Sequence, residues 1–225
     1  MNGSTERDTD ALVGALAGCA APVRRLRSPH LRMAIWFMIS VMFAALVVAA
    51  MGLRPDIGLR LQEPQFVVEV VAALMTSMLA AGAAFCAGCP GRPLWERFAP
   101  LPALGVWLAS LGTGCWAAWI STGPEGLRIT PDLMCFPYIV LVGSVPAVLI
   151  LAMIRRGAPI APITATMLAA LAAASLGAAA LRLFHQQDAS LMVLTWHVGS
   201  VAILTGIGAL IGRSFLRWPQ NAKTY

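Results

Sequence analysis

The chain has 225 residues, of which 59% are hydrophobic and only 12% are charged, and its formal net charge is +6. A mean hydropathy of +0.76 excludes an ordinary soluble domain and indicates that the lipid bilayer is the main solvent of this protein. The positive charge is therefore expected to act at a membrane surface, and we expect no direct nucleic-acid partner.

A polar segment comes before the first apolar run, and part of it predicts a short helix. Residues 8–20 have helical periodicity, with Thr9 or Asp10 as the N-cap and Pro22 beyond the end. One face of this helix is an apolar stripe. The stripe consists of Leu12, Val13, Leu16, Cys19 and Ala20.

Such a short helix is marginal alone in water, so we expect it to form against another surface. One alternative is a helix that lies on the membrane, and the other is a helix that docks in a partner's groove. The acidic residues Glu6, Asp8 and Asp10 favour the partner, because interfacial helices are typically rich in Lys and Arg. Leu12, Val13 and Leu16 are the candidate partner-binding residues.

Six apolar runs then fill the chain, each about as long as the ~20 residues that a membrane-spanning helix needs. Their residues do not alternate between polar and apolar, so they predict helices and not a barrel. The expected fold is all-α and polytopic, with six transmembrane helices. The predicted spans are residues 33–52, 66–88, 99–120, 136–154, 160–181 and 192–212. This divides the chain into an N-terminal segment (1–32), a membrane bundle (33–212) and a C-terminal tail (213–225).

The basic residues are distributed unevenly between the two sides of this bundle. Twelve of the 16 Lys and Arg residues fall on the side of the two termini, and the others are Arg54, Arg60, Arg128 and Arg182. By the positive-inside rule, both termini are cytoplasmic. We therefore predict a multi-pass protein that is located in a bacterial inner membrane.

Two charged or titratable groups lie inside predicted spans, where they require an explanation. Glu69 is about one turn inside the second span, and a structural ion pair with Arg182 or Arg60 is one alternative to a role in ion handling. Arg182 ends the fifth span, from which its long side chain can also reach outward to the interface. His197 in the sixth span is either a hydrogen-bonded core histidine or a ligand or sensor residue.

The five cysteines fall on both sides of the membrane. Cys86 and Cys89 form a C-x-x-C on the cytoplasmic side, but no second such motif completes a zinc site, and the role of this pair stays open. Cys115 and Cys135 are expected near the outer surface, in the same layer as His185 and His197. Thiolate and imidazole ligands suit zinc, cadmium or copper, although a purely structural role is the alternative.

No hydrolase, metalloprotease or phosphate-binding motif is present, so we do not expect an enzyme. Several short stretches are instead shared, in the same order, with a known family. They are residues 22–29 (PVRRLRSP), 52–56 (GLRPD), 101–102 (LP), 110–115 (SLGTGC), 135–136 (CF), 155–159 (RRGAP), 181–188 (LRLFHQQD) and 196–197 (WH). In these the chain resembles the NrsF (negative regulator of sigma-F) family of six-helix membrane anti-sigma factors.

The resemblance implies that the N-terminal segment holds an extracytoplasmic-function sigma factor, of the sigma-F type, at the membrane. It also implies that periplasmic cysteines respond to oxidants or heavy metals and trigger release. Cys135 occupies one of the expected cysteine positions, but His185 occupies the other. A disulfide between these positions is excluded here, so Cys115 is the partner of Cys135, or Cys135 and His185 hold a metal, or the signal differs.

The resulting interpretation is a membrane-anchored anti-sigma factor with a sensor formed by Cys135, His185, Cys115 and His197. The alternative is a small transporter of metals or ions, in which Glu69, Arg182 and His197 form an intramembrane polar path. A membrane subunit of a larger enzyme is a third alternative.

Overall fold

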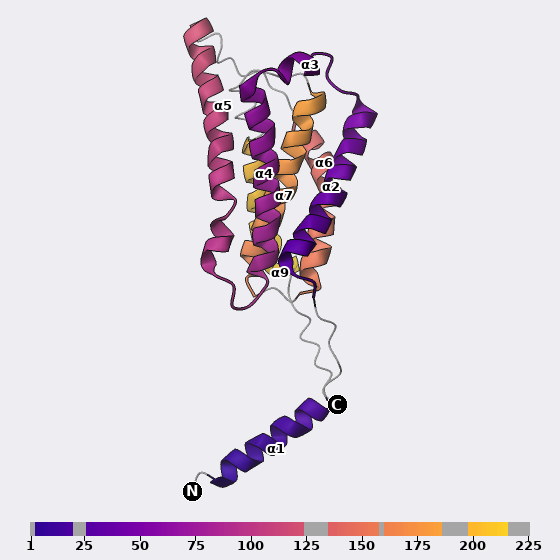
Figure 1. The fold of residues 1–225 in the computed structure, drawn as a ribbon, viewed down its shortest axis with the longest axis vertical. Helices are drawn as coiled ribbons and strands as arrows, with labels where there is room; N and C mark the ends of the chain where they lie inside the picture. Colours follow the sequence, from indigo (N-terminus) through magenta and orange to yellow (C-terminus); the bar gives the residue numbers. More distant parts are fainter. Residues whose placement is uncertain (1–2, 20–25, 124–134, 158–159, 186–197, 216–225) are drawn as a thin grey trace.

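The structure is a computed structural model that describes residues 3–19, 26–123, 135–157, 160–185 and 198–215. All regular secondary structure in these ranges is helical, which confirms the predicted all-α class. The helices from α2 onward form one bundle whose long members run roughly parallel (Figure 1). The elements are α1 (Gly3–Cys19), α2 (Pro29–Met51), α3 (Ile57–Arg60), α4 (Pro64–Ala87), η1 (Leu94–Phe98), α5 (Leu101–Thr122), α6 (Cys135–Arg155), α7 (Pro162–Phe184) and α9 (Gly199–Phe215).

Five of the six predicted spans correspond to helices that are long and apolar enough to cross a membrane: α2, α4, α5, α6 and α7. The sixth prediction, 192–212, is only partly covered. Its described part is the apolar helix Gly199–Gly212, which is shorter than a spanning helix, and residues 186–197 lie outside the described ranges. The sixth span and the orientation of the termini therefore stay predictions.

Proline and serine set where the spanning helices begin. Helix α2 starts four residues before the predicted position, because Pro29 suits the first helical position and Ser28 caps it, with Leu31 N–H donating to Ser28 Oγ over 3.4 Å. Pro64 and Pro162 likewise stand at the start of α4 and α7, where no side chain caps the helix. The first residues of these helices therefore define the two ends of the bundle, where the polar residues lie.

Helix α1 is longer than the sequence predicts, so the predicted start at residue 8 and the N-cap at Thr9 or Asp10 are wrong. Both residues lie inside the helix, which begins at Gly3. The physical reason is that no proline interrupts residues 3–19, and acidic residues in the first half of a helix interact favourably with its positive N-terminal end. The observed end at Cys19 is close to the predicted one.

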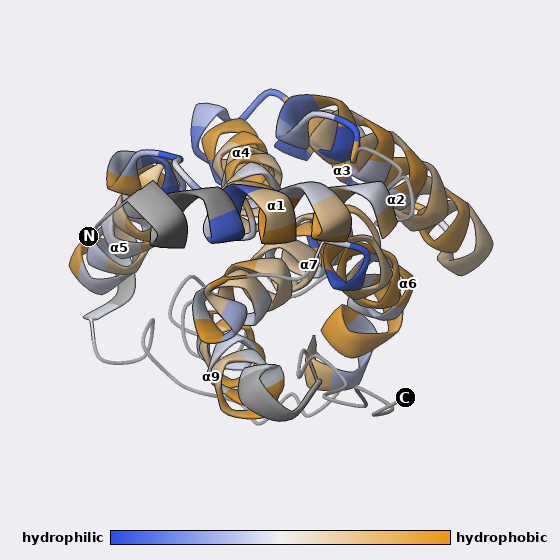
Figure 2. Ribbon diagram, turned by 90° about the horizontal axis from the view of Figure 1, so that it is seen from below, coloured by the Kyte–Doolittle hydropathy of each residue, from blue (hydrophilic) through white to orange (hydrophobic). Residues whose placement is uncertain are grey.

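Helix α7 is the centre of the bundle and packs against α4, α9, α6 and α2 (Figure 2). Its sequence is rich in alanine. Because this side chain is small, several neighbouring helices can approach α7 closely. Ser77 Oγ on α4 donates to the Ala172 carbonyl over 2.7 Å and joins these two helices. The buried alanines of α7 are Ala165, Ala169, Ala172, Ala173, Ala174, Ala178, Ala179 and Ala180.

Glycine permits the closest approach between α7 and α6. A Cβ added at Gly177 would lie 2.7 Å from the carbonyl oxygen of Ile139, and one at Gly143 would lie 3.1 Å from that of Ala173. Backbone atoms cannot yield as a flexible side chain can. Small residues at these positions therefore set the α6–α7 spacing.

This spacing gives a first prediction. We expect Gly177→Ala to destabilise the bundle by about 1–3 kcal/mol, because the added methyl group forces two backbones apart. Gly105→Ala on α5 is the matched control, since a Cβ there meets nothing within 4 Å and alanine favours helix by up to about 1 kcal/mol. Thermal unfolding in detergent should show a lower Tm than that of the unaltered chain for Gly177→Ala only. Equal Tm values for the two variants would contradict the proposed contact.

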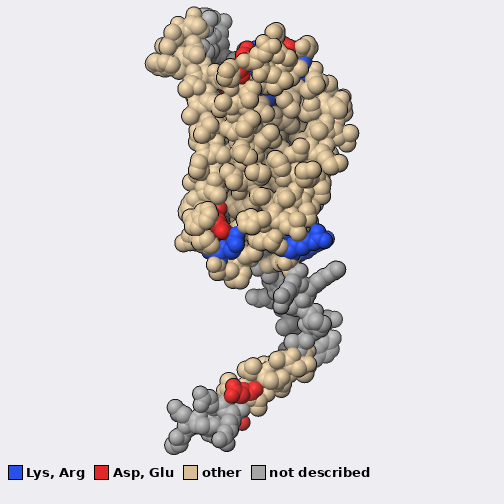
Figure 3. Space-filling view, viewed as in Figure 1, with Lys and Arg blue, Asp and Glu red and all other residues tan. Residues whose placement is uncertain are grey.

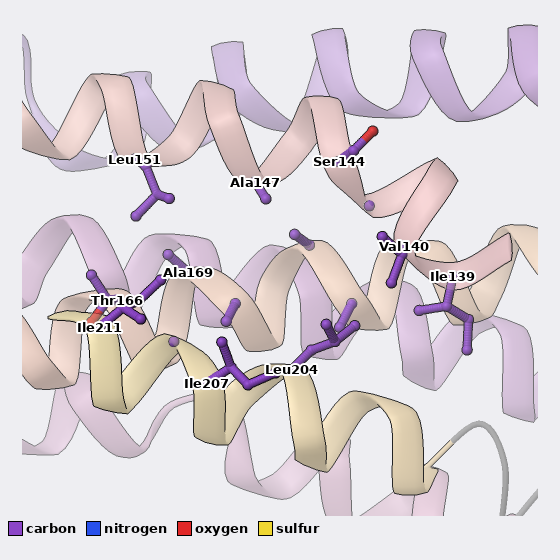
Figure 4. A pocket seen from close by; sticks show the side chains of 15 residues that line it. Ile139, Val140, Ser144, Ala147, Leu151, Thr166, Ala169, Leu204, Ile207 and Ile211 are labelled. Atoms are coloured by element: carbon purple, nitrogen blue, oxygen red, sulfur yellow. The ribbon is translucent and has the colours of Figure 1, made fainter. Parts of the chain in front are cut away.

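A shallow apolar groove of about 180 Å³ runs along the outside of the bundle between α6, α7 and α9. Figure 4 shows Val140 and Leu151 of α6 on one side and Leu204 and Ile207 of α9 on the other. Its polar side chains are limited to Ser144 and Thr166. The groove has the surface expected of a bundle that meets hydrocarbon chains.

Candidate functional site

Two regions contain the candidate functional residues: helix α1 and the end of the bundle that holds α3, here called the α3 end. The opposite end, which holds η1, is called the η1 end. Residues 8–19 of α1 are all exposed, and the three candidate partner-binding residues Leu12, Val13 and Leu16 are 59%, 58% and 64% exposed. Isolated large apolar side chains on a surface are common, but three on one helical stripe are typical of a docking face.

Arg54 organises the α3 end. Its guanidinium forms a bidentate pair with Asp56, at 2.7 and 2.9 Å, although the Arg54 residue is only 2% exposed. Its backbone N–H donates to the Leu183 carbonyl over 3.1 Å and its Nη1 donates to the His185 carbonyl over 3.5 Å. The loop after α2 is thereby attached to the end of α7, which is the segment that contains His185.

The hydrogen bonds from Arg54, with further help from Arg60, hold the pKa of the Asp56 carboxyl well below its usual range. A carboxyl whose folded pKa is depressed contributes stability that is present above its unfolded pKa and is lost as the pH falls. The Arg54–Asp56 pair therefore stays ionised at neutral and mildly acidic pH.

A second ion pair lies deeper. Arg182 Nη2 of α7 is 2.8 Å from Glu69 Oε2 of α4, and their side chains are only 11% and 5% exposed. This confirms the predicted structural pairing of Glu69, and it identifies Arg182 as the partner. Arg60 pairs instead with Asp56 and Glu63.

Of the two possibilities for Arg182, pairing with Glu69 is the observed one, and the side chain does not reach outward to the interface. Its guanidinium stays inside the bundle, beside Glu69 and 5.1 Å from the centre of the Phe66 ring. Gln65 extends the same network, since its amide donates to Glu69 over 3.3 Å and to the Ser110 carbonyl of α5 over 3.1 Å. Each side chain supplies the counter-charge that the other needs once both are removed from water.

The structure brings His185 close to the start of α6. His185 follows the last residue of α7, and its ring centre lies 5.8 Å from that of Tyr138. Tyr138 is in the first turn of α6, the helix that begins at Cys135. The segments that carry the two predicted metal ligands are therefore neighbours at the α3 end.

Cys115 is half-buried on α5, with a free thiol. Helix α5 packs mainly against α4, whereas α6 packs against α7 and α2, and α5 and α6 lie on opposite sides of α7 (Figure 2). A Cys115–Cys135 disulfide requires Cα atoms within ~7 Å, so this arrangement favours Cys135 and His185 as partners.

His197 and Asp188 lie outside the described residues. Within the described ranges, no group of three or more His, Cys, Asp and Glu side chains is placed to hold a metal ion.

The C-x-x-C pair lies at the η1 end, and its two thiols have different partners. Arg92 Nη2 donates to Cys86 Sγ over 3.5 Å and Arg92 Nε to Glu96 over 2.9 Å. Cys89 Sγ donates to the Phe85 carbonyl over 3.5 Å. These contacts join the end of α4 to η1.

Sequence reasoning missed Arg54 and Arg32 as structural residues. It treated Arg54 only as a charge in an outer loop, although the adjacent Pro55 and Asp56 indicate a tight turn with a local Arg–Asp pair. Arg32 is 7% exposed; it lies directly before the predicted first span (33–52) but inside the observed helix α2, so the predicted boundary concealed it as a buried charge.

Comparison with known proteins gives one match. A family model described as NrsF, negative regulator of sigma F, matches residues 16–218. No curated protein and no solved structure matches the chain. The matched range extends from the last turn of α1 past the end of α9, and it includes both ends of the bundle. The chain therefore belongs to the NrsF family, the negative regulators of sigma F.

Proposed function

We propose that this protein is a membrane-anchored anti-sigma factor, and not an enzyme, that holds an extracytoplasmic-function sigma factor at the bacterial inner membrane. Membership of the family implies a sigma factor as the partner. Five helices of membrane-spanning length supply the anchor. The observation that carries the proposal is α1, a helix with an exposed apolar stripe that precedes this anchor.

The binding face is the stripe of Leu12, Val13 and Leu16. Sigma factors are soluble, so a regulator that anchors one must present a surface outside the bilayer. An amphipathic helix whose apolar residues recur at helical spacing is suited to a groove between the helices of a partner. The family match begins at residue 16, so Leu12 and Val13 are assigned from exposure and periodicity alone.

A transcription reporter tests the proposal in cells. The reporter strain lacks the chromosomal gene for this protein. In it, we expect the full chain to repress a sigma-dependent promoter. Residues 23–225 should insert in the membrane but should not repress the promoter. Repression by the truncated chain at equal membrane abundance would place the binding surface outside α1.

The proposed orientation gives a further prediction. Alkaline phosphatase fused after Asp132 or Asp188 should be active, because these positions follow the third and fifth spans and are expected in the periplasm. A fusion after Arg156, at the η1 end, should be inactive. The reverse pattern would contradict both the cytoplasmic termini and the periplasmic sensor.

We place the sensor at the α3 end, on Cys135 and His185, with Cys115 and His197 as further candidates. Helix α7 ends beside His185 and passes through the centre of the bundle to the η1 end. In the proposed orientation, a shift of this one helix would carry the signal from the sensor to the cytoplasmic side. Release requires that this connection has two discrete arrangements of different affinity for the sigma factor. Because His185 cannot form a disulfide, we propose metal, and not peroxide, as the direct signal, with zinc, cadmium or copper as the candidate ions.

The sensor is tested by substitution and metal binding. Cys135→Ser and His185→Ala should each lower zinc or cadmium binding in detergent and lock the protein in one signalling state. Cys115→Ser should leave both properties unchanged if Cys135 and His185 alone form the sensor, and a loss of metal binding in this variant would place Cys115 in the sensor as well. A Cys115–Cys135 crosslink found by mass spectrometry after oxidant treatment, together with no measurable metal binding, would refute the metal version.

A further inference from the structure

A groove of about 750 Å³ opens at the η1 end between the start of α2 and the end of α6. This volume is within the range of about 300–1,000 Å³ that is typical of small-molecule sites. Basic side chains gather at this end of the bundle (Figure 3). The residues that line the groove include Leu26, Arg27, Arg32, Ile35, Met153 and Arg156.

Arg32 is the buried member of this set, with 7% of its surface exposed. Its guanidinium donates to the Met153 carbonyl and lies 4.5 Å from the centre of the Phe85 ring. A carbonyl and a ring are neutral partners, so the charge of Arg32 is not balanced by them.

The surrounding charges do not balance Arg32 either. Within the described bundle, the carboxylate at the η1 end is Glu96, and it pairs with Arg92 over 2.9 Å. Arg27 and Arg156 are exposed and add two more positive charges to the groove. Burying a charge without a counter-ion is costly, so three arginines around one groove favour an anionic ligand.

The deeper wall of the groove has the opposite character. Ile35 is one turn along α2 from Arg32, and Met153 and Leu149 are successive turns along α6 from Arg156. All three are apolar, and they lie toward the hydrocarbon side of the arginines. A ligand that satisfies both parts needs an anionic head and an apolar chain.

We propose that this groove binds an anionic phospholipid. Its phosphate lies among Arg27, Arg32 and Arg156, and an acyl chain lies along Ile35, Leu149 and Met153. Basic pockets between membrane helices bind such headgroups. Because Leu26 and Arg27 belong to the segment that follows α1, a lipid bound here also fixes the base of that segment at the membrane surface. The inference does not depend on the identity of the sigma factor.

Native mass spectrometry of the full chain in detergent tests the proposal with two lipids of equal chain length, phosphatidylglycerol and phosphatidylcholine. We expect preferential retention of phosphatidylglycerol. Each exposed arginine contributes roughly fivefold to the affinity for an anionic lipid, so Arg156→Gln should lower phosphatidylglycerol retention roughly fivefold, and Arg27→Gln with Arg156→Gln should lower it roughly 25-fold. Equal retention of both lipids by the unaltered chain would overturn the proposal.

Three controls separate this site from general attraction to basic protein. Arg97→Gln removes one charge from the same end, but Arg97 does not line the groove, so it should change retention less than twofold; an effect as large as that of Arg156→Gln would refute the site. Arg156→Lys should retain most of the preference. An excess of inorganic phosphate should leave the lipid bound, because phosphate lacks the acyl chain, and displacement by phosphate would refute a lipid site.

A competing occupant is the acidic part of α1. If Asp8 and Asp10 filled the groove in the free protein, Asp8→Asn with Asp10→Asn would increase lipid retention severalfold. We expect no change in this variant, and an increase would contradict the lipid as the resident ligand. Circular dichroism and size-exclusion chromatography establish that each variant keeps the fold. The substituted side chains are exposed, except that of Arg97, which is half-buried.

Discussion

Replacing Leu12 and Leu16 together with aspartate is expected to release the sigma factor from the membrane while the bundle stays inserted. Burial of two leucine side chains on a partner stabilises a complex by about 3–6 kcal/mol in total. Its loss therefore weakens binding by well over tenfold. The measurement is the fraction of sigma factor that sediments with membranes. Both leucines are exposed in the chain alone, so the substitutions should not affect folding of the bundle.

The matched control for this variant is Gly14→Asp with Gly18→Asp. These positions have the same spacing of four residues and add the same charge, but they lie on the opposite face of α1. A Cβ at either position meets nothing within 4 Å. We expect near-normal retention of the sigma factor. Equal losses in the two double variants would attribute the effect to charge alone, and unchanged retention in the leucine variant would exclude this face.

Removing one partner of the Glu69–Arg182 pair is expected to destabilise the bundle by about 3–5 kcal/mol, because the remaining charge is left buried. Glu69→Met and Arg182→Met should each lower the Tm measured in detergent. The double variant Glu69→Met with Arg182→Met should regain most of the loss, since two apolar side chains replace the pair without leaving a charge. A double variant as unstable as the sum of the single variants would contradict a direct interaction.

An exposed ion pair at the same end is the control. Glu63 is half exposed and pairs with Arg60 over 2.8 Å. Glu63→Met should cost at most about 1 kcal/mol, because solvent screens such pairs. Comparable Tm losses for Glu63→Met and Glu69→Met would mean that burial does not strengthen the Glu69–Arg182 pair. The comparison also bears on the transporter alternative, because a closed ion pair between α4 and α7 favours a structural role for Glu69.

The sequence predicts the spanning helices well because hydrocarbon imposes one strong rule, that about 20 apolar residues form a helix. It places their ends less well, since starts depend on local chemistry. Ser28 and Pro29 begin α2 earlier than hydropathy alone indicates. The sixth predicted span is described only from its later part, the helix Gly199–Gly212, because residues 186–197 lie outside the described ranges.

The candidate site is predicted in part. The Glu69–Arg182 pair follows from the cost of unpaired charge in a membrane, which leaves few partners at the same depth. The contacts of Arg54 with the Leu183 and His185 carbonyls cannot be predicted from the sequence. Every residue has a backbone carbonyl, so the residue type does not indicate which carbonyl accepts a hydrogen bond. The proximity of the start of α6 to His185 depends on the packing of α6 on α7, which Gly143 and Gly177 determine.

Co-purification tests the central claim most directly. Membranes that contain the affinity-tagged full chain, or residues 23–225 with the same tag, are solubilised in mild detergent, and the sigma factor retained by each is measured. The account predicts that the full chain retains the sigma factor and that residues 23–225 retain little, at equal amounts of folded bundle. Equal retention by both, or none by the full chain, would contradict an anti-sigma factor that acts through its N-terminal helix.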